Sequence, residues 1–503
     1  MGTSLLAIDQ GTTGTTALVM DARGKTLGRA TVELPQHYPQ PGWVEHDADE
    51  IWETVVAAIA GAMASAGLPG SELGAIGITN QRETALLWER TTGQPTRRAV
   101  VWQDRRTAER CAALEAAGRV AEVRRATGLV IDPYFSATKV GWMLDEDPTL
   151  RERAQGGEIA FGTIDAYLAF RLAGGVAAGA PHVTDATNAS RTLLMDLKRR
   201  EWHPGMCEIF GVPMAMLPRI VPSAGIVAHT HGVPGLPDGV PIAGLAGDQH
   251  AALFGQACFE PGQAKCTYGT GAFVLVNTGR QPIDSDSGLL ATVAWQVGEQ
   301  VTYALEGSCF VAGAAVQWLR DGLGVIENAG QVEELARSVP DSDGVVFVPA
   351  LAGLGAPHWD PNARGLVTGL TRRSTAAHLA RATLEAIAFQ VNDLLLAMKA
   401  DLEAPISRLR VDGGAAANDL LMELQSDLSA VCVERPTELE TTARGAAMLA
   451  GVGAGIFTGA ADAAQMISID RTFSPRVDDR DRLARVSRWN DAVKRTRSRA
   501  QHN

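Results

Sequence analysis

Short apolar runs alternate along the chain with segments of helical periodicity. Residues 378–402 carry apolar side chains at helical spacing and contain no Gly or Pro, which predicts one long amphipathic helix. The charged, alanine-rich stretch 105–126 is also typical of helix. The apolar runs predict strands over residues 74–79, 99–102, 344–351 and 409–414. The alternation of the two kinds of segment favours an α/β architecture.

Two stretches of the chain share a strand–turn–strand pattern. Residues 5–20 place a Gly/Thr loop between two apolar runs, and residues 263–277 place the tip Tyr268-Gly269-Thr270-Gly271 between two more. The two tips lie about half the chain apart, as they would in a duplicated domain, although two unrelated tight hairpins are the alternative. Gly lets a phosphate approach the backbone and Thr adds a hydroxyl donor, so each tip is a candidate phosphate-binding loop.

Neither of the common nucleotide-binding loops is present. Gly24-Lys25-Thr26 resembles the end of a P-loop, but the earlier glycine that the motif needs falls on Val19. The G-x-G-x-x-G pattern fails as well, because Gly269-Thr270-Gly271 is followed by Val274 at the third glycine position. What is left is a pair of β-hairpins, one per domain, that close on a nucleotide between them.

Two carboxylates stand where an apolar run ends at a turn. Asp9 ends the first run just before the Gly/Thr loop, where it could hold Mg²⁺ on the phosphates, mostly through water. Asp248 follows the run 242–247 and is the candidate base for an attacking hydroxyl. The alternative is that each Asp simply caps a turn or a helix.

A polar cluster, Asn80 to Thr84, interrupts the apolar pattern after a predicted strand. Arg82 and Glu83 offer a fork of donors beside a pair of acceptors, which suits hydroxyl groups. Trp102 and Tyr134 supply aromatic faces for C–H groups, so together these side chains predict a site for a small polyol. A surface hairpin with an incidental ion pair is the alternative.

Composition narrows the class of protein. The 503 residues suffice for two to four domains, and the net charge of −12 argues against a nucleic-acid surface. The six cysteines form no C-x-x-C pair, so neither a zinc site nor a disulfide framework is indicated. With no signal peptide and no apolar run near 18 residues, we expect a cytoplasmic protein that does not insert into a membrane. The basic stretch 493–503 is expected to be a solvated tail.

Several motifs, in order from residue 9 to about 451, carry a resemblance. They include DQGTT, GITNQRE, VWQDRRT, TGLVIDPYFS, HVTDATNASRT, AGDQ, TYGTG, LEGS and RVDGGAAAN. On these motifs the chain resembles the carbohydrate kinase family, and within it the glycerol kinases. The resemblance implies an α/β fold of two duplicated ribonuclease-H-like domains, of the actin/sugar-kinase ATPase type, flanking a catalytic cleft. An N-terminal domain, 1–252, would hold the polyol site and first phosphate hairpin, and a C-terminal domain, 253–503, the second hairpin and nucleoside site.

The resemblance also implies a reaction: ATP-dependent phosphorylation of glycerol to sn-glycerol 3-phosphate by direct in-line transfer, the first step of glycerol catabolism. Glycerol and ATP would be the substrates, Mg²⁺ the metal and a homodimer or homotetramer the assembly. The alternative within enzymes is a kinase of erythritol, dihydroxyacetone or xylulose. A non-catalytic ATP-driven protein such as actin or a heat-shock chaperone shares the hairpin pair, but it lacks the polyol site.

Residue by residue, the resemblance gives each candidate a role. Asp248 would be the catalytic base, and Asp9 and Asp248 would organise the metal. The substrate would contact Arg82, Glu83, Trp102, Tyr134, Asp248 and Gln249. The nucleotide would contact Thr12, Thr13, Gly14, Gly269, Thr270, Gly313, Gln317, Gly414 and Asn418. The chain departs from the family at Thr16, where relatives commonly carry an Arg that is expected to reach the phosphates.

Overall fold

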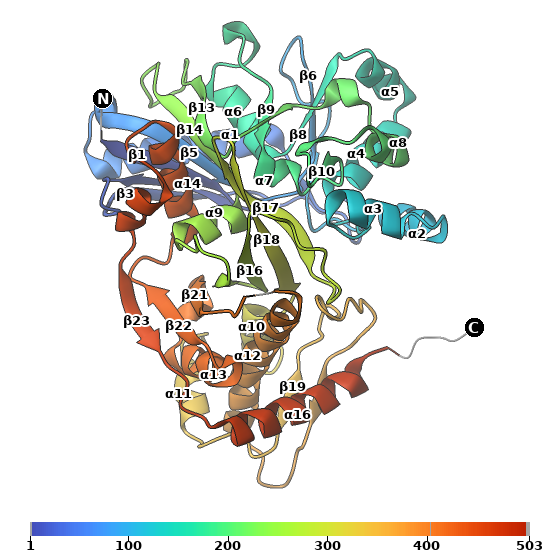
Figure 1. The fold of residues 1–503 in the computed structure, drawn as a ribbon, viewed down its shortest axis with the longest axis vertical. Coiled ribbons are helices and arrows are strands. Elements are labelled where there is room, and N and C mark those ends of the chain that lie inside the picture. Colours follow the sequence, from blue (N-terminus) through green and yellow to red (C-terminus); the bar gives the residue numbers. More distant parts are fainter. Residues whose placement is uncertain (1–2, 403, 499–503) are drawn as a thin grey trace.

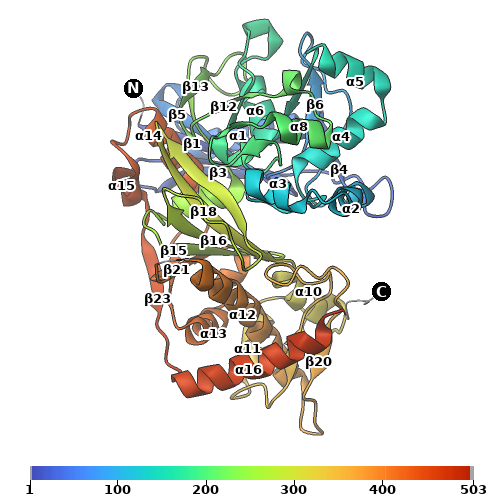
Figure 2. The same cartoon turned by 45° about the vertical axis from the view of Figure 1, so that its right-hand side comes forward.

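A 13-stranded sheet runs through both halves of the chain in the computed structural model, which describes residues 3–402 and 404–498. Its strands lie in the order β23 (Ile469–Phe473), β22 (Cys432–Pro436), β21 (Arg408–Asp412), β15 (Gln263–Tyr268), β16 (Ala272–Gly279), β18 (Gln300–Cys309), β17 (Leu290–Val297), β13 (Ala224–His229), β14 (Pro241–Gly247), β5 (Leu73–Asn80), β1 (Ser4–Gln10), β2 (Gly14–Met20) and β3 (Thr26–Glu33). Figure 1 shows two lobes along this sheet, one built mainly from the blue-to-green half of the chain and the other from the yellow-to-red half. In Figures 1 and 2, β16 and β18 lie where the lobes meet.

Short ladders and helices surround the main sheet. The two-stranded sheets are β4 (Glu45–His46) with β7 (Ala99–Val100), β6 (Leu86–Glu89) with β8 (Ile159–Gly162), β9 (Val183–Asp185) with β12 (Arg219–Val221), β10 (Met195–Asp196) with β11 (Glu201–Trp202), and β19 (Val346–Val348) with β20 (Leu366–Thr368). The α-helices are α1 (Ala48–Ala66), α2 (Ala108–Ala116), α3 (Val120–Thr127), α4 (Ser136–Asp145), α5 (Pro148–Gln155), α6 (Ile164–Leu172), α7 (Ala186–Ala189), α8 (Pro204–Phe210), α9 (Asp248–Gly255), α10 (Gly313–Asp321), α11 (Gln331–Arg337), α12 (Ala376–Asp401), α13 (Asp419–Ser429), α14 (Thr441–Gly453), α15 (Ala460–Ala463) and α16 (Asp479–Thr496). Within the described ranges, none of these helices is both long and apolar enough to cross a bilayer.

Strand β1 is buried on both faces, which explains its unbroken apolar sequence. Leu6 and Ile8 belong to a core cluster with residues of α1 and α6, while Leu5 and Ala7 belong to another with residues of α9 and α14. Side chains alternate between the two faces of a strand, so a strand covered by helices on both sides needs apolar residues at consecutive positions. Although α14 comes late in the chain, it packs against β1, β5 and β14 of the first half.

The structure confirms both predicted hairpins. β1 pairs with β2, and β15 with β16, in antiparallel register on either side of the Gly/Thr tips. The strands predicted at 74–79 and 409–414 are β5 and β21, and the long helix predicted at 378–402 is α12.

Other sequence predictions need correction. The helical stretch 105–126 is divided into α2 and α3 at Gly118, whose φ of 75° no helix can continue through. The strands predicted at 99–102 and 344–351 shrink to β7 and β19, which lie outside the main sheet. The basic stretch is not wholly a solvated tail, because residues 493–496 end α16 with Val493 and Thr496 buried. Residues 499–503 lie outside the described residues.

Candidate active site

The candidate site forms where three neighbouring strands end. β1, β5 and β14 run parallel, with Asp9 beside Thr79 and Gly247 beside Asn80. The carboxyl ends of parallel strands meet at one edge of a sheet, which is where α/β proteins bind their ligands. Asp9, the turn after Asn80 and the start of α9 at Asp248 therefore come together although they are distant in sequence.

Asp248 is the first residue of α9, and one of its oxygens is already occupied. Its Oδ1 lies 3.0 Å from Arg82 Nε and accepts a hydrogen bond of 2.6 Å from the backbone N–H of Gln249. Oδ2 has no hydrogen-bond partner among the residues that the structure describes, and the side chain is 31% exposed. Glycine at 247 permits this geometry, since a Cβ there would lie 2.6 Å from Arg82 Cγ. Asp248 thus presents one free carboxylate oxygen to the site.

Arg82 and Glu83 lie inside a buried charge network. Arg82 donates to both oxygens of Glu306, at 2.5 and 3.0 Å, and Arg191 donates to Glu306 Oε1 at 3.0 Å and to Glu83 Oε1 at 2.6 Å. Burial alone would raise the pKa of Glu306, but the two guanidinium groups outweigh it and hold that pKa well below its usual range. All the residues from Asn80 to Thr84 are buried, so the alternative of a surface hairpin with an incidental ion pair is wrong.

The two aromatic residues form a wall beside Arg82. The rings of Trp102 and Tyr134 meet edge to face with centroids 5.6 Å apart, and Arg82 Nη2 donates to the Tyr134 hydroxyl at 3.3 Å. Trp102 Nε1 donates to Thr12 Oγ1 at 2.8 Å. The predicted polyol side chains therefore touch one another, and they also touch the first Gly/Thr hairpin.

A buried lysine connects the same cluster to the second hairpin. Lys265 on β15 donates through Nζ to Gln249 Oε1 and, at 2.9 Å, to Thr267 Oγ1. At the tip beyond, the backbone N–H of Gly313 donates to Gly269 O at 2.9 Å. Contacts thus continue from the first hairpin through the polyol residues to the second.

The remaining nucleotide candidates lie at the rim of this arrangement. Thr13 and Gly14 line a cavity of about 490 Å³ that also includes Thr16. Thr270, Gln317 and Gly414 are exposed. Gly414 follows Gly413, where a Cβ would lie 2.5 Å from Tyr268 O, so this turn packs against the tip of the second hairpin. Asn418 uses Oδ1 to cap α13, accepting from the backbone N–H of Leu421 at 2.9 Å.

The acid pair has the electrostatics of a cation site. Burial raises the pKa of Asp9 to about 8, and the neighbouring charge of Asp248 adds to the shift. A divalent cation bound at Asp9 would offset this penalty. Residues 3–402 and 404–498 contain no group of three or more His, Cys, Asp or Glu side chains that could hold a metal. One or two carboxylates are what an ion such as Mg²⁺ needs from a protein when it keeps most of its water and binds substrate phosphates.

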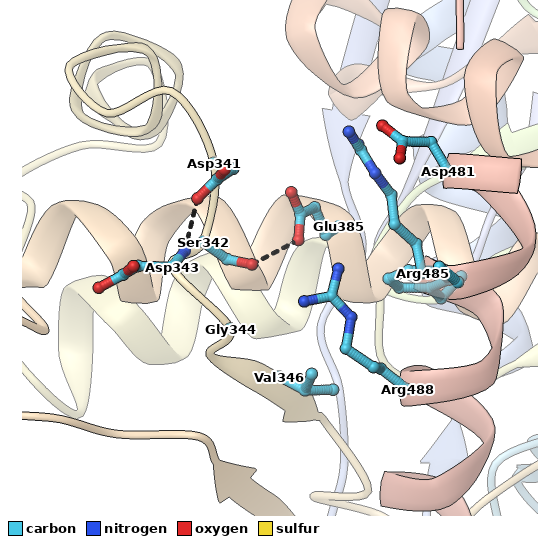
Figure 3. Close-up of a pocket in the computed structure, with 11 residues that line it drawn as sticks. Asp341, Ser342, Asp343, Gly344, Val346, Glu385, Asp481, Arg485 and Arg488 are labelled. Atoms are coloured by element: carbon cyan, nitrogen blue, oxygen red, sulfur yellow. Dashed lines mark hydrogen bonds between the residues drawn. The ribbon is translucent and has the colours of Figure 1, made fainter. Parts of the chain in front are cut away.

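A second cavity, of about 290 Å³, lies in the other lobe between α12, α16 and the segment 341–346 (Figure 3). Arg485 and Arg488 extend into it from α16, and Ser342 donates to Glu385 at 2.9 Å on the opposite side. None of the residues predicted for the active site lines this cavity.

Sequence reasoning missed three buried charged residues that contact the site. Arg191 and Glu306 stand in motifs that carried the resemblance, but no role was assigned to either, and Lys265 was passed over within a strand. The available signal for Glu306 and Lys265 was a single charge inside a strand-like run, since an unpaired buried charge is too costly to persist. Arg191 gave no such signal, because it stands in the polar stretch 185–192. Such a charge indicates a buried partner, but the sequence does not say which one.

Comparison with known proteins places the chain in a family. The N-terminal domain of the FGGY family of carbohydrate kinases matches residues 4–255, and the C-terminal domain of the same family matches residues 264–454. The chain belongs to the FGGY family of carbohydrate kinases, and the predicted two-domain sugar-kinase fold is confirmed.

Individual relatives are similar over almost their whole length. A glycerol kinase of Myxococcus xanthus is 54% identical, with 98% of this chain and 99% of the relative covered. One of Citrifermentans bemidjiense is 55% identical, with 97% and 98% covered. The crystal structure of Plasmodium falciparum glycerol kinase with ADP superimposes with a TM-score of 0.91 at 34% identity, covering 99% of this chain and 98% of that one.

Proposed function

We propose that this chain is an ATP-dependent kinase that phosphorylates glycerol to sn-glycerol 3-phosphate. The relatives named glycerol kinase, similar over nearly the full chain, support this reaction. Within the structure the proposal rests on one observation about Asp248. Arg82 Nε lies 3.0 Å from its Oδ1 and orients the carboxylate, and Oδ2 stays free at the edge of the sheet where the predicted polyol residues lie.

The proposed mechanism is direct in-line transfer of the γ-phosphoryl group to a terminal hydroxyl of glycerol. Asp248 Oδ2 would accept the hydroxyl proton as the new O–P bond forms. Arg82 and Glu83 would hold the hydroxyls, and Trp102 and Tyr134 would pack on the carbon skeleton. Because phosphoryl transfer asks little covalent chemistry of the protein, catalysis would come from positioning and charge stabilisation.

The nucleotide is proposed to lie between the two hairpins. Its phosphates would contact the backbone and hydroxyls of both tips, and its nucleoside would lie against the second half of the chain. The phosphate residues in this proposal are Thr12, Thr13, Gly14, Gly269 and Thr270; the nucleoside residues are Gly313, Gln317, Gly414 and Asn418. Gripping the phosphates from both sides requires closure, which would also exclude water as a competing acceptor.

Asp9 and Asp248 would hold Mg²⁺ mostly through its water ligands, which leaves Oδ2 of Asp248 available to the acceptor hydroxyl. When bound with ATP, the ion neutralises phosphate charge and orients the phosphates. Three expectations stay predictions: the division of the chain near residue 252, assembly into a homodimer or homotetramer, and residence in the cytoplasm. Light scattering after gel filtration tests the assembly.

An acceptor panel tests the reaction. ADP release with MgATP would be measured with glycerol, erythritol, dihydroxyacetone, xylulose and no acceptor. The product would then be offered to a dehydrogenase that accepts only sn-glycerol 3-phosphate. We expect release with glycerol and full oxidation of the product. Preference for another acceptor would overturn the substrate, and release independent of every acceptor would leave only an ATPase.

A further inference from the structure

The buried network around Arg82 contains a carboxylate, Glu306, that is not among the predicted substrate residues. Glu306 is 1% exposed and lies on β18, where the backbone is paired with β16 at Leu275 and with β17 at Leu290. A residue fixed by ladders on both sides holds its side chain at a defined point. That point lies against Arg82 and Arg191, two arginines that are themselves buried.

The network is an alternating row of charges that ends at the proposed base. Glu83 accepts from Arg191, Arg191 and Arg82 both donate to Glu306, and Arg82 Nε reaches Asp248. Glu306 is the central member, since it is the carboxylate that both arginines share. Removing it would leave two buried guanidinium groups short of a partner, which is costly enough to make them rearrange.

The direction of that rearrangement follows from the shape of the guanidinium group. An arginine fork binds a carboxylate most strongly through two parallel N–H bonds. In this structure Glu306 takes the two Nη groups of Arg82, so Asp248 receives only Nε, and only on Oδ1. Without Glu306, the nearest carboxylates left to the fork are Asp248 and Glu83. A bidentate pair with Asp248 would engage Oδ2, the oxygen that the acceptor hydroxyl needs.

We propose that Glu306 is a positioning residue that, together with Arg191, holds the Arg82 fork away from Asp248 and so keeps Oδ2 of the base free for the acceptor hydroxyl. The inference rests on the proposed function, because it gives Asp248 and Arg82 their roles there. It assigns to Glu306 an effect on the acceptor half of the reaction and none on the nucleotide half.

Glu306→Gln tests this, because it keeps the size of the side chain and removes the charge. The matched control is Glu434→Gln: Glu434 on β22 also accepts from two arginines, Arg408 and Arg410, but contacts none of the predicted site residues. Both variants would be checked by gel filtration and thermal unfolding, and kcat and KM would be measured separately for glycerol and for ATP.

For Glu306→Gln we expect a kcat about 10- to 100-fold lower than wild type, a scale typical of a misplacement near 1 Å. The KM for glycerol should be at least fivefold higher, and the KM for ATP should stay within twofold of wild type. Glu434→Gln should match wild type in all three constants. If Glu306→Gln is not obtained folded, Glu306→Asp replaces it, since its shorter carboxylate cannot reach both arginines; the same split between the two KM values is expected.

Two results would overturn the inference. One is a folded Glu306 variant with the glycerol KM and kcat of wild type. The other is an equal loss in both Glu306→Gln and Glu434→Gln with unchanged KM values, which is what a purely structural role gives. Failure of the proposed function looks different, because the wild-type protein itself would then show no glycerol-dependent turnover.

Discussion

Replacing Gly247 with Ala tests the packing that sets the distance between Arg82 and Asp248. Gly247 has φ −61° and ψ 150°, which any residue adopts, so the substitution introduces no backbone strain. Its effect is steric, since the added Cβ would lie 2.6 Å from Arg82 Cγ, 2.7 Å from Cδ and 3.0 Å from His250 Nδ1. A carbon contact needs about 3.5–4.0 Å, so the stem of Arg82 must move by about 1 Å.

That shift has two consequences, a loss of stability and a loss of catalytic rate. Overpacking costs about 1–3 kcal/mol, partly offset by the roughly 0.4–1 kcal/mol that Ala gains over Gly through the unfolded state, so the loss of stability should be about 1–2 kcal/mol. A 1 Å misplacement of a positioning group costs about 100-fold in rate. We therefore predict a folded Gly247→Ala variant with kcat for glycerol phosphorylation about 10- to 100-fold lower.

The assay is glycerol-dependent ADP release, with thermal unfolding measured on the same samples. Gly459→Ala serves as the control, because a Cβ at Gly459 meets nothing within 4 Å, and it should retain wild-type kinetics. A Gly247→Ala enzyme whose kcat and glycerol KM both stay within twofold of wild type would refute the claim that Arg82 must lie where it does.

Three further predictions concern other contacts. Trp102→Phe removes the 2.8 Å hydrogen bond to Thr12, worth about 0.5–1.5 kcal/mol, and should lower kcat/KM for ATP about two- to tenfold in steady-state assays. An unchanged kcat/KM for ATP would show that this hydrogen bond does not couple the polyol residues to the nucleotide. Thr16→Arg would place a cation across the β1–β2 ladder from Asp9 and should tighten ATP binding several-fold, as measured by calorimetry. An unaltered affinity for ATP would contradict a phosphate-binding role for this position. Burial, with the Arg90 charge adding to it, lowers the pKa of His182 from 6.5 to about 4, so its contribution to stability is complete above pH 6.5 and is lost as pH falls toward 4. Between pH 6.5 and 4 the unfolding free energy of His182→Gln should therefore fall less than that of wild type, by a difference on the order of 3 kcal/mol at most. Parallel plots of stability against pH for the two proteins would contradict this.

Local patterns determined how well the sequence predicted the fold. The hairpins at 5–20 and 263–277 and the helix at 378–402 were correctly predicted, because turn chemistry and apolar periodicity act within a few residues. The strand predicted over 344–351 was too long, because apolar runs also form short ladders outside a main sheet, as β19 does.

The site was predictable to the extent that its residues follow strand ends. Asp9, Arg82 and Asp248 each stand just past an apolar run, and sheet topology brings such positions together. Glu306 was not predictable in this way, because it lies in the middle of β18 and its partners come from segments more than 100 residues away. Pairing across such distances is set by tertiary packing, which one sequence does not display.

The central claim is that Asp248 removes the proton from glycerol during transfer from ATP. The most direct test is turnover of wild type and Asp248→Asn with saturating MgATP and glycerol, with glycerol binding measured separately by calorimetry. If Asp248 is the base, the wild type turns over only with glycerol, and the variant loses about 100- to 10,000-fold in turnover, the range expected for removal of a general base, while it still binds glycerol. Turnover of Asp248→Asn within tenfold of wild type would contradict it.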